Sequence, residues 1–408
     1  MDDEPKTLLV TLTGKDRPGV TSAILAALAA AGVAVLDIEQ IVLRRRLVLG
    51  ILVTAPRDWK KLRDVVERTA ADLGMSVEID RGAGDNRTRP GDRSHITVIG
   101  NPLKAAAMSA IAGRIADAGA NIDKIERMAR YPVTAIELHV SGAPADRLRP
   151  VLAAEAVRQG IDLAVQRDSL HRRGVRLIVM DVDSTLVQGE VIEMLAAHAG
   201  QEAEVARVTE AAMRGELDFE QSLRERVALL EGVPESALDE VYDAILLAPG
   251  ARTMVRTLRR LGYRFAIVSG GFSQITDRLA ADLGIHFSRA NELEVADGRL
   301  TGRIVGQVVD RAGKAEALRE FAREVGVPTD AVIAVGDGAN DLDMLNAAGL
   351  GIAYNAKPLV RDAADTSVNV PYLDTILYLL GISREQIEEA DAEAGIVTPA
   401  PPVVGYER

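Results

Sequence analysis

The sequence predicts an α/β protein in which two small domains of mixed strands and helices precede a parallel sheet covered by helices. Two observations support this prediction. The first 168 residues contain the same order of strand and helix patterns twice. From residue 174 onward, strand and helix patterns alternate, and the strand candidates are apolar along almost their whole length. Such strands are typical of a parallel sheet that is buried on both faces.

The repeat in the first half is visible in matching segments at a constant offset. Ser22-Ala23-Ile24 matches Ser109-Ala110-Ile111, and Ala31-Gly32 matches Ala118-Gly119. Each copy predicts the order βαββαβ, which is the ferredoxin-like arrangement. After a first strand and helix, the two copies predict strand pairs within 40–54 and 127–140, helices at 59–73 and 145–158, and last strands at 76–79 and 162–166.

These patterns predict the organisation of the chain. The first domain is expected over residues 1–81 and the second over 93–168, with a polar linker at 82–92. The alternating region predicts a third domain over 174–385, followed by an acidic, then Pro-rich tail at 386–408.

The third domain contains four strand candidates and one long insertion. The helix-rich stretch at about 190–248 is too long for a simple crossover and therefore predicts a helical cap. The strand candidates are Arg176–Met180, Arg264–Val268, Ala331–Val335 and Gly351–Ala353.

Composition limits the classes of function. The formal net charge of −12 gives no support to nucleic-acid binding through a broad cationic field. The chain has no cysteine, which excludes disulfides, thiolate catalysis and thiolate metal sites. With only five histidines, oxygen ligands are favoured for any metal, which indicates a hard cation such as Mg²⁺. The acidic N-terminus and the lack of a long apolar run predict a cytoplasmic protein without a membrane span.

Chemically active side chains follow three of the predicted strands. Asp181 and Asp183 come directly after the first strand, Ser269-Gly270 follows the second, and Gly336–Asp341 follows a later one. Lys314 stands between the last two, at the predicted start of a helix. Open α/β sheets place their sites at the carboxyl ends of their strands, so we expect these groups to meet.

The acidic residues suit a metal-assisted nucleophile. Asp181, Asp183 and Asp337 can surround one Mg²⁺, with Asp183 contributing its backbone carbonyl. Asp181 would keep one oxygen free to attack phosphorus and form an aspartyl phosphate. Asp183 could protonate the departing alkoxide and then take a proton from the hydrolytic water.

The remaining groups suit phosphate oxygens. Ser269, the amide of Gly270 and Lys314 would bind these oxygens, where the charge is greatest. Each motif alone also has a structural interpretation. The Asp181/Asp183 pair could cap a helix, Ser269-Gly270-Gly271 could be a strand–helix turn, and Lys314 could be an exposed lysine. All of them occur in order, each at a predicted strand end or helix start, and this joint pattern favours phosphoryl transfer.

The region from residue 174 to about 385 resembles the haloacid dehalogenase superfamily, and within it the phosphoserine phosphatase family. The resemblance implies a Rossmann-like core with a helical cap, Asp181 as nucleophile, Asp183 as general acid and base, and Asp337 as metal ligand. It also implies that Asn340 helps to bind the substrate and that Asp341 supports the water shell of the metal. The four motifs appear as Asp181-Val182-Asp183-Ser184-Thr185, Ser269-Gly270-Gly271, Lys314 and Gly336-Asp337-Gly338-Ala339-Asn340-Asp341.

The cap sequence from Met213 to Leu230 resembles the same family closely. By this resemblance Glu190 would meet the substrate ammonium and Arg226 its carboxylate, while Met213 and Phe219 would close the apolar side of the pocket. An arginine fork suits a carboxylate, which agrees with this assignment. Other interpretations remain open, with Met213 and Phe219 as cap core and Glu190 as a charge at a helix N-terminus.

The two repeated domains resemble the ACT family of small-molecule sensors, which often bind amino acids at dimer interfaces. The first copy has the family's ligand loop as Gly14-Lys15-Asp16-Arg17-Pro18-Gly19-Val20, whereas the second reads Gly100-Asn101-Pro102-Leu103-Lys104. The resemblance implies a homodimer and an allosteric site for serine at Asp16 and Gly19. A structural interpretation has equal weight, with Asp16 capping a helix and Pro18 in its first turn.

The expected function is Mg²⁺-dependent hydrolysis of O-phosphoserine to serine and phosphate, the last step of serine biosynthesis, with amino-acid regulation by the ACT domains. One alternative is a phosphotransferase, or a phosphatase for another phospho-amino acid or a phosphoprotein. Another is an amino-acid sensor with a vestigial phosphatase half. The complete set of charged residues from Asp181 to Asp341 argues against a vestigial site.

Overall fold

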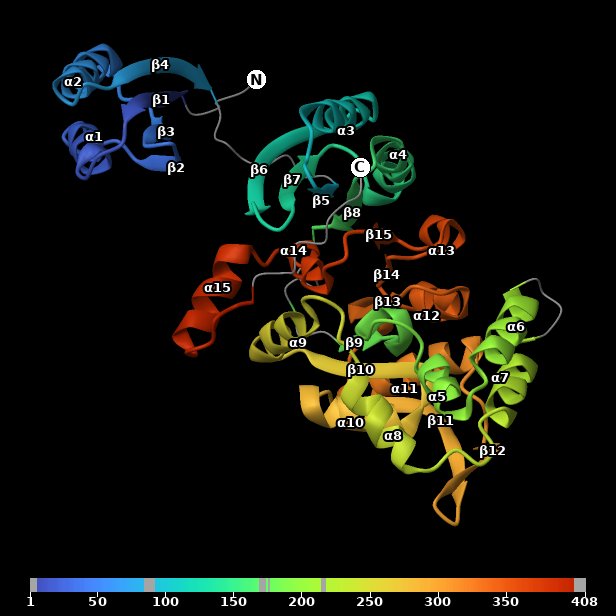
Figure 1. Ribbon diagram of the computed structural model, residues 1–408. Helices are drawn as coiled ribbons and strands as arrows, with labels where there is room; N and C mark the ends of the chain where they lie inside the picture. The colour runs from blue at the N-terminus through green and yellow to red at the C-terminus, as the bar shows by residue number, and fades with distance from the viewer. Residues whose placement is uncertain (1–5, 84–91, 169–173, 175–176, 214–217, 400–408) are drawn as a thin grey trace. The chain divides into compact units, whose positions relative to one another are not determined.

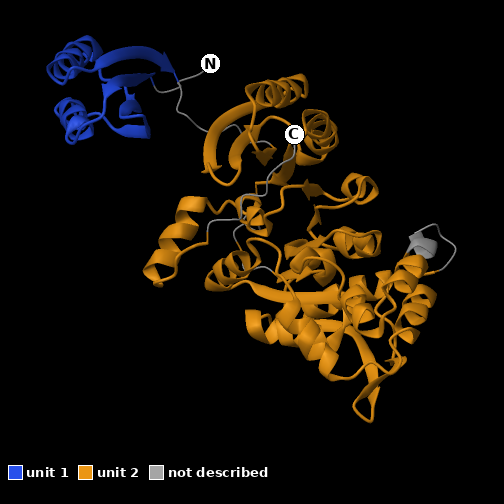
Figure 2. Cartoon of the chain, in the orientation of Figure 1, with its two compact units in different colours: residues 1–90 blue, residues 91–408 orange. Residues whose placement is uncertain are grey.

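The computed structural model describes residues 6–83, 92–168, 174, 177–213 and 218–399 (Figure 1). The chain divides into two compact units, residues 1–90 and 91–408 (Figure 2). Most of the predicted linker and the end of the predicted tail, residues 400–408, lie outside the described residues. No helix among the described residues is both long enough and apolar enough to cross a membrane.

The first unit is a ferredoxin-like domain with the predicted βαββαβ order. Its four strands form an antiparallel sheet in the order β2-β3-β1-β4. Leu8, Val10 and Leu12 alternate along β1 and form the core with Ile24 and Val66 of the two helices. The elements are β1 (Lys6–Lys15), α1 (Val20–Ala29), β2 (Val35–Leu43), β3 (Arg46–Thr54), α2 (Trp59–Asp72) and β4 (Ser76–Ala83).

The second unit begins with the second copy of the same fold, in the sheet order β6-β7-β5-β8. One face of this sheet packs on its own helices, with Ile96 and Val98 in that core. Ile99 and Ala164 belong instead to the main core of the following domain. The elements are β5 (Arg93–Gly100), α3 (Ala105–Asp117), β6 (Asn121–Ala129), β7 (Thr134–Ser141), α4 (Ala145–Gln159) and β8 (Asp162–Arg167).

The larger domain is built on a seven-stranded sheet in the order β12-β11-β10-β9-β13-β14-β15. Successive residues of β9 enter different cores, Ile178 and Met180 on one face and Leu177 and Val179 on the other, so the sheet is buried on both faces as predicted. The strands are β9 (Leu177–Met180), β10 (Arg264–Phe272), β11 (Phe287–Ala296), β12 (Arg299–Val305), β13 (Val332–Gly336), β14 (Leu350–Tyr354) and β15 (Thr366–Val368).

Helices cover both faces of this sheet. The predicted cap consists of α5 (Val191–Ala199), α6 (Glu202–Met213), α7 (Phe219–Ala228) and α8 (Ser236–Ala244). The core helices are α9 (Ala251–Arg260), α10 (Ser273–Leu283), α11 (Arg311–Val325), α12 (Leu342–Ala347) and α13 (Pro358–Ala363), followed by α14 (Ile376–Leu379) and α15 (Arg384–Glu393).

The sheet is not parallel throughout, because β12 runs antiparallel to β11. This edge hairpin was not predicted from the sequence. Its second strand supports the cap, since the amide of Gly232 donates to the carbonyl of Leu300 (2.9 Å) and the amide of Leu300 to the carbonyl of Val233 (2.9 Å). The hairpin therefore joins the cap to the edge of the core sheet.

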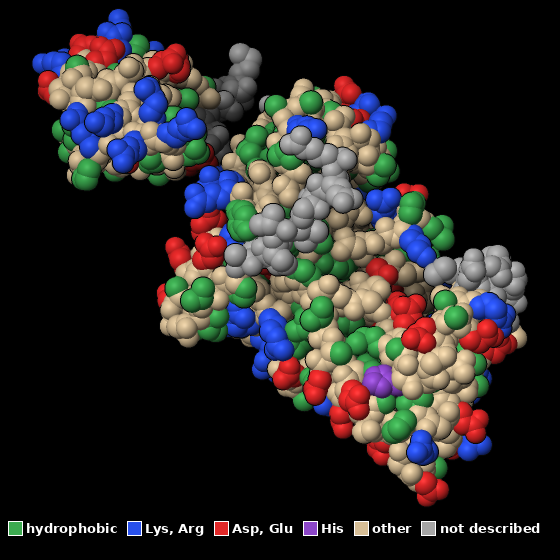
Figure 3. Space-filling model, in the orientation of Figure 1, with side chains coloured by type: hydrophobic (Ala, Val, Ile, Leu, Met, Phe, Trp, Pro, Cys, Tyr) green, Lys and Arg blue, Asp and Glu red, His purple; other side chains and the backbone are tan. Residues whose placement is uncertain are grey.

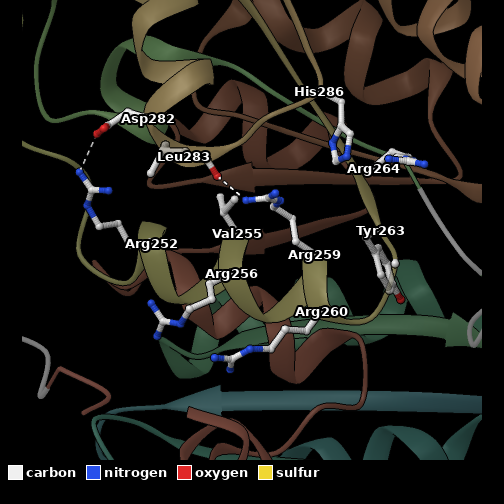
Figure 4. A pocket seen from close by; sticks show the side chains of 11 residues that line it. Arg252, Val255, Arg256, Arg259, Arg260, Tyr263, Arg264, Asp282, Leu283 and His286 are labelled. Atoms are coloured by element: carbon white, nitrogen blue, oxygen red, sulfur yellow. Dashed lines mark hydrogen bonds and ion pairs between the residues drawn. The ribbon is translucent and has the colours of Figure 1, made fainter. Parts of the chain in front are cut away.

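The C-terminal helix α15 is held to α9 by a buried carboxylate. Asp391 is fully buried and accepts hydrogen bonds from Arg256 and Arg260. A cavity of about 700 Å³ is lined by these two arginines and by Arg252, Arg259 and Arg264. Figure 4 shows the side chains that line it. Burial alone would raise the pKa of Asp391, but the arginine hydrogen bonds lower it to about 2. We therefore interpret these two arginines as an anchor for the C-terminal segment.

Charges of both signs are interspersed over the face of the second unit that Figure 3 shows.

Candidate active site

The loop after β9 separates the two predicted acidic residues. The amide of Asp181 donates to the carbonyl of Val335 (2.9 Å), which ties the start of the loop to β13. Ser184 has a left-handed φ of 56°, and its amide donates to the carbonyl of Gly189 (3.0 Å). The two carboxylates have different partners, Lys314 for Asp181 and Ser269 for Asp183.

Asp181 lies in a buried cluster with one lysine and a second carboxylate. Nζ of Lys314, which is fully buried, is 2.6 Å from Oδ1 of Asp181 and 2.7 Å from Oδ1 of Asp341. Lys314 is in the first turn of α11, where Asp310 caps the helix by accepting from the amide of Gly313 (2.7 Å). The predicted helix start is thus confirmed, and it places the ammonium between the two acids.

The lysine and the two carboxylates of this cluster change one another's pKa values. Burial raises the pKa of Asp181 well above its ordinary value, the charge of Asp341 adds to this, and Lys314 opposes it. Burial alone would lower the pKa of Lys314, but the charges of Asp181 and Asp341 outweigh it and raise the pKa. The lysine therefore remains an ammonium ion and favours the ionised form of Asp181.

Three carboxylates in the site fit a divalent cation. Oxygen atoms of Asp181, Asp337 and Asp341 lie within 4.8 Å of one another. Oδ1 of Asp337 accepts from Oγ1 of Thr185 (3.1 Å), and burial raises the pKa of Asp337 to about 6. Three carboxylates facing one ammonium leave an excess of negative charge, and oxygen ligands of this kind suit a hard cation.

The carboxylate of Asp183 is not part of that group. Its Oδ1 accepts from the amide of Val191 (2.9 Å) and its Oδ2 from Oγ of Ser269 (3.1 Å). Burial raises the pKa of Asp183, and the hydrogen bonds from Val191 and Ser269 oppose the rise. The side chain of Asp183 is therefore engaged by Val191 and Ser269, and metal binding by its backbone carbonyl stays a prediction.

The Ser-Gly-Gly turn at the end of β10 requires its glycines because other groups come close. A Cβ on Gly270 would lie 2.9 Å from Cζ of Phe219, and one on Gly271 would lie 2.8 Å from Oδ2 of Asp183. Ser269 is fully buried, and its Oγ accepts from the amide of Gly271 (2.7 Å). The cap residue Phe219 thus packs directly on this turn.

A buried asparagine that the sequence analysis missed supports the same turn. Nδ2 of Asn291 donates to the carbonyl of Gly270 (2.8 Å), and its Oδ1 accepts from the amide of Val309 (2.8 Å). The residue is in β11, which carries no recognised motif, so no signal in the sequence could have found it.

A cavity of about 430 Å³ lies between the cap and the strand ends. Ser269, Lys314 and Asp341 are buried beneath it. Met213 ends α6, and its side chain lies outside the described residues. The predicted residues that line the cavity are Asp181, Asp183, Glu190, Phe219, Arg226, Gly270, Asp337 and Asn340. Lining residues that the sequence analysis missed include Thr209, Lys357 and Leu359.

The cap side of the cavity carries one acidic and one basic group. Oε1 of Glu190 accepts from Oγ of Ser184 (3.1 Å), and burial, with the charge of Asp183, raises the pKa of Glu190 to about 7. Nε of Arg226 donates to the carbonyl of Ser222 (3.3 Å), and burial lowers the pKa of Arg226. Arg226 forms no ion pair with any residue that the structure describes.

The structural interpretation of Asp16 as a helix cap is wrong. The residue before α1 is Gly19, which has a left-handed φ of 94°, and no side chain caps this helix. Asp16 is exposed, and its amide donates to the carbonyl of Arg45 (2.8 Å). Pro18 precedes the helix rather than standing in its first turn.

Comparison with protein families agrees with this architecture. Residues 178–346 match the family of haloacid dehalogenase-like hydrolases. Residues 6–80 and 93–166 each match an ACT domain family. The two ferredoxin-like domains are therefore ACT domains, and the larger domain is a haloacid dehalogenase-like hydrolase.

Relatives match almost the whole chain. It is 59% identical over 390 residues to a phosphoserine phosphatase of Streptomyces coelicolor, covering 95% of each protein. It is 53% identical to a phosphoserine phosphatase of Mycobacterium tuberculosis, covering 95% of this chain and 96% of the relative.

Solved structures show the same relationship. A probable phosphoserine phosphatase from Vibrio cholerae, in an unliganded form, is 35% identical with a TM-score of 0.57, covering 72% of this chain and 88% of that one. A haloacid dehalogenase family hydrolase from Salmonella enterica serovar Typhi is 27% identical with a TM-score of 0.62, covering 70% and 98%. Together with the buried Asp181–Lys314–Asp341 cluster at the strand ends, these likenesses show that the chain belongs to the phosphoserine phosphatase family of haloacid dehalogenase-like hydrolases.

Proposed function

We propose that this protein hydrolyses O-phosphoserine to serine and phosphate through an aspartyl phosphate on Asp181, as the last step of serine biosynthesis. The observation that carries the proposal is one cavity that joins a nucleophilic carboxylate, Asp181, to an acidic and a basic group, Glu190 and Arg226. Asp181 suits the phosphate end of the substrate, and Glu190 and Arg226 suit its amino-acid end.

Asp181, Asp337 and Asp341 would hold a Mg²⁺ ion, with the backbone carbonyl of Asp183. Bound there, the cation supplies charge neutralisation between the attacking carboxylate and the phosphoryl group. Lys314 contributes the same kind of stabilisation from beneath the cavity, because its ammonium contacts both Asp181 and Asp341. Ser269 and the amide of Gly270 would bind the remaining phosphoryl oxygens.

The reaction takes two steps at phosphorus. An oxygen of Asp181 attacks phosphorus, the bond to the seryl oxygen breaks, and Asp183 gives its proton to the departing alkoxide. Asp183 then takes a proton from a water molecule that attacks phosphorus, which releases phosphate and restores Asp181. The raised pKa of Asp183 supports its role as the acid in the first step.

The cap would recognise the amino-acid end of the substrate. Glu190 would bind the ammonium, which would favour the ionised form of a carboxyl whose pKa is about 7 in the free protein. Arg226 would bind the carboxylate, for which its planar fork is suited. Asn340 would add a polar contact, and Met213 with Phe219 would close the apolar side.

A phosphate-release assay tests this proposal. The unmodified protein should release phosphate from O-phosphoserine faster than from O-phosphothreonine or a phosphopeptide, and only with Mg²⁺ or a similar cation. Faster turnover of one of the other substrates would favour the alternative phosphatases. A phosphoryl product formed on an added alcohol would favour a phosphotransferase, and no release from any substrate would favour the vestigial site.

The ACT domains support regulation by an amino acid and assembly into a homodimer. We propose that serine binds the first copy near Asp16 and Gly19, where the left-handed Gly19 shapes the loop between β1 and α1. Strand β2 is an edge strand with exposed apolar residues, among them Ile41 at 49% and Leu43 at 60% exposure, which supports a subunit contact there. The cytoplasmic location remains a prediction from the sequence.

Serine titration into the full chain tests the regulatory part. Heat of binding should appear for the unmodified protein and be weaker for Asp16→Ala, while the basal phosphatase rate should be the same for both. If the unmodified protein gives no heat and no change in rate, serine is not its ligand.

A further inference from the structure

The second ACT domain gathers two of the five histidines of the chain around one glutamate. His95 is in β5, and Glu137 and His139 are in β7, two adjacent antiparallel strands of the same sheet. Nδ1 of His95 lies 3.1 Å, and Nε2 of His139 lies 3.4 Å, from Oε1 of Glu137. The cluster is outside the catalytic cavity and has no part in the proposed phosphatase reaction.

These distances suit a tetrahedral metal ion. Ligand atoms about 2.0–2.1 Å from Zn²⁺ at tetrahedral angles are about 3.3 Å from one another. The two separations to Oε1 of Glu137 are close to that value, and the three ligand atoms together lie within 4.8 Å of one another. Two imidazoles and a carboxylate are a common ligand set for zinc.

A second layer of carboxylates surrounds the three residues. Nε2 of His95, the nitrogen that faces away from Glu137, lies 3.2 Å from Oδ1 of Asp168. Carboxylates in this position orient metal-binding histidines and fix their tautomer. Oε2 of Glu126 lies 3.1 Å from Nε2 of His139, where it can become a fourth ligand. Lys124 contacts the other oxygen of Glu126 (2.7 Å).

Two neutral histidines have too few N–H groups to donate a hydrogen bond to every carboxylate that faces them. A neutral imidazole has a single N–H, yet both nitrogens of His95 face a carboxylate, Glu137 on one side and Asp168 on the other. The same nitrogen of His139 faces both Glu126 and Glu137. A cation between His95, Glu137 and His139 would supply the missing positive charge and leave the N–H of His95 for Asp168.

The cluster is also accessible to an ion. The side chains of His95 and Glu137 are 7% and 5% exposed, whereas those of His139 and Asp168 are 31% and 42% exposed. A metal would therefore enter from the His139 side and be held against the buried pair.

We propose that His95, Glu137 and His139 form a binding site for a divalent transition metal of the zinc class, with Asp168 orienting His95. Glu126 completes the coordination or binds through a water molecule. The site is distinct from the catalytic cation site, which has only oxygen ligands. A bound metal would tie β5 to β7 and stabilise the second ACT domain, because it binds the folded state.

The test uses the full chain in excess Mg²⁺, which occupies the oxygen-ligand site. Equilibrium dialysis should leave one Zn²⁺ per chain, and Co²⁺ in its place should give the intense visible absorption of a tetrahedral site. His139→Gln should lower the Zn²⁺ affinity about 100-fold or more, and Asp168→Asn about 10-fold or more. The partly exposed His198, on α5, provides the control His198→Gln, which should bind Zn²⁺ as the unmodified protein does.

Two further measurements make the outcome decisive. Glu137→Gln keeps a hydrogen-bond acceptor but loses the charge, so it should lose Zn²⁺, and circular dichroism would show that it is folded. The phosphatase rate of His139→Gln in Mg²⁺ should be unchanged. If the unmodified protein retains no Zn²⁺, or if His139→Gln and Asp168→Asn bind it as tightly, the cluster is a hydrogen-bond network with protonated histidine and the proposal is overturned.

Discussion

Replacing Arg226 by methionine should remove recognition of the substrate carboxylate without disturbing the fold. Arg226 lines the catalytic cavity from α7, burial lowers its pKa, and it has no ion-pair partner among the described residues. A cation held in this way is costly in the free protein and is compensated when a carboxylate binds. Methionine keeps an unbranched apolar stem, although a shorter one, and removes the charge and the hydrogen-bond donors.

The expected loss follows from the energy of a charged hydrogen bond. Removing such a bond costs about 1.5–3 kcal/mol, so kcat/KM for O-phosphoserine should fall about 10- to 150-fold. Phosphoethanolamine has the ammonium and the phosphate of the substrate but no carboxylate. Its kcat/KM should therefore change by less than about threefold, because Arg226 has nothing to bind in it.

The neighbouring arginine supplies a matched control. Arg224 is on the same helix, is 47% exposed and pairs with Glu220 (2.7 Å), and it does not line the cavity. Arg224→Met should leave both substrates unaffected. If Arg226→Met lowers kcat/KM equally for the two substrates, Arg226 acts on cap structure and does not bind the substrate carboxylate.

Three other predictions concern the packing around the site and the C-terminal anchor. The folded pKa of Asp391 is about 2, below its ordinary value of 3.8, so its stabilisation is complete above about pH 4 and is lost as the pH falls toward 2. This stabilisation amounts to about 2 kcal/mol. Urea unfolding should therefore show a free energy of unfolding lower by this amount in Asp391→Asn at pH 7, with a smaller difference at low pH. A difference that does not change with pH would show that the ionisation of Asp391 does not stabilise the fold. Gly270→Ala should raise KM and destabilise the protein by about 1–3 kcal/mol, because the new Cβ would lie 2.9 Å from Cζ of Phe219. The control Gly113→Ala should not destabilise the protein, because no atom lies within 4 Å of its new Cβ. Asn291→Asp keeps the acceptor for Val309 but loses the donor to Gly270, so kcat should fall about 10-fold, and an unchanged kcat would show that the turn does not need this support.

The repeat and the strand ends were predictable because they depend on local patterns. Short apolar runs marked β9, β10, β13 and β14 in the sequence. The residues that follow these strands meet because parallel strands end at one edge of the sheet. The start of α11 was predicted around Lys314, and the lysine does lie between Asp181 and Asp341.

The missed elements lack such patterns. Strands β11 and β12 are an edge hairpin with many half-exposed residues, so they show no continuous apolar run. Asn291 acts through its hydrogen bond to the carbonyl of Gly270, which is 21 residues away in the sequence. A local sequence pattern cannot predict such a contact. Asp16 was considered as a helix cap because of its residue type, but the left-handed Gly19 occupies the cap position instead. In each case the deciding contact or backbone angle is set by the tertiary structure.

The proposed mechanism depends on Asp181 as the nucleophile. Phosphate release from O-phosphoserine in Mg²⁺, measured for the unmodified protein and for Asp181→Asn, tests it most directly. We expect steady release by the unmodified protein and a loss of about a thousandfold or more in the variant, since the amide cannot form the covalent intermediate. No release by the unmodified protein, or release by Asp181→Asn at a similar rate, would contradict it.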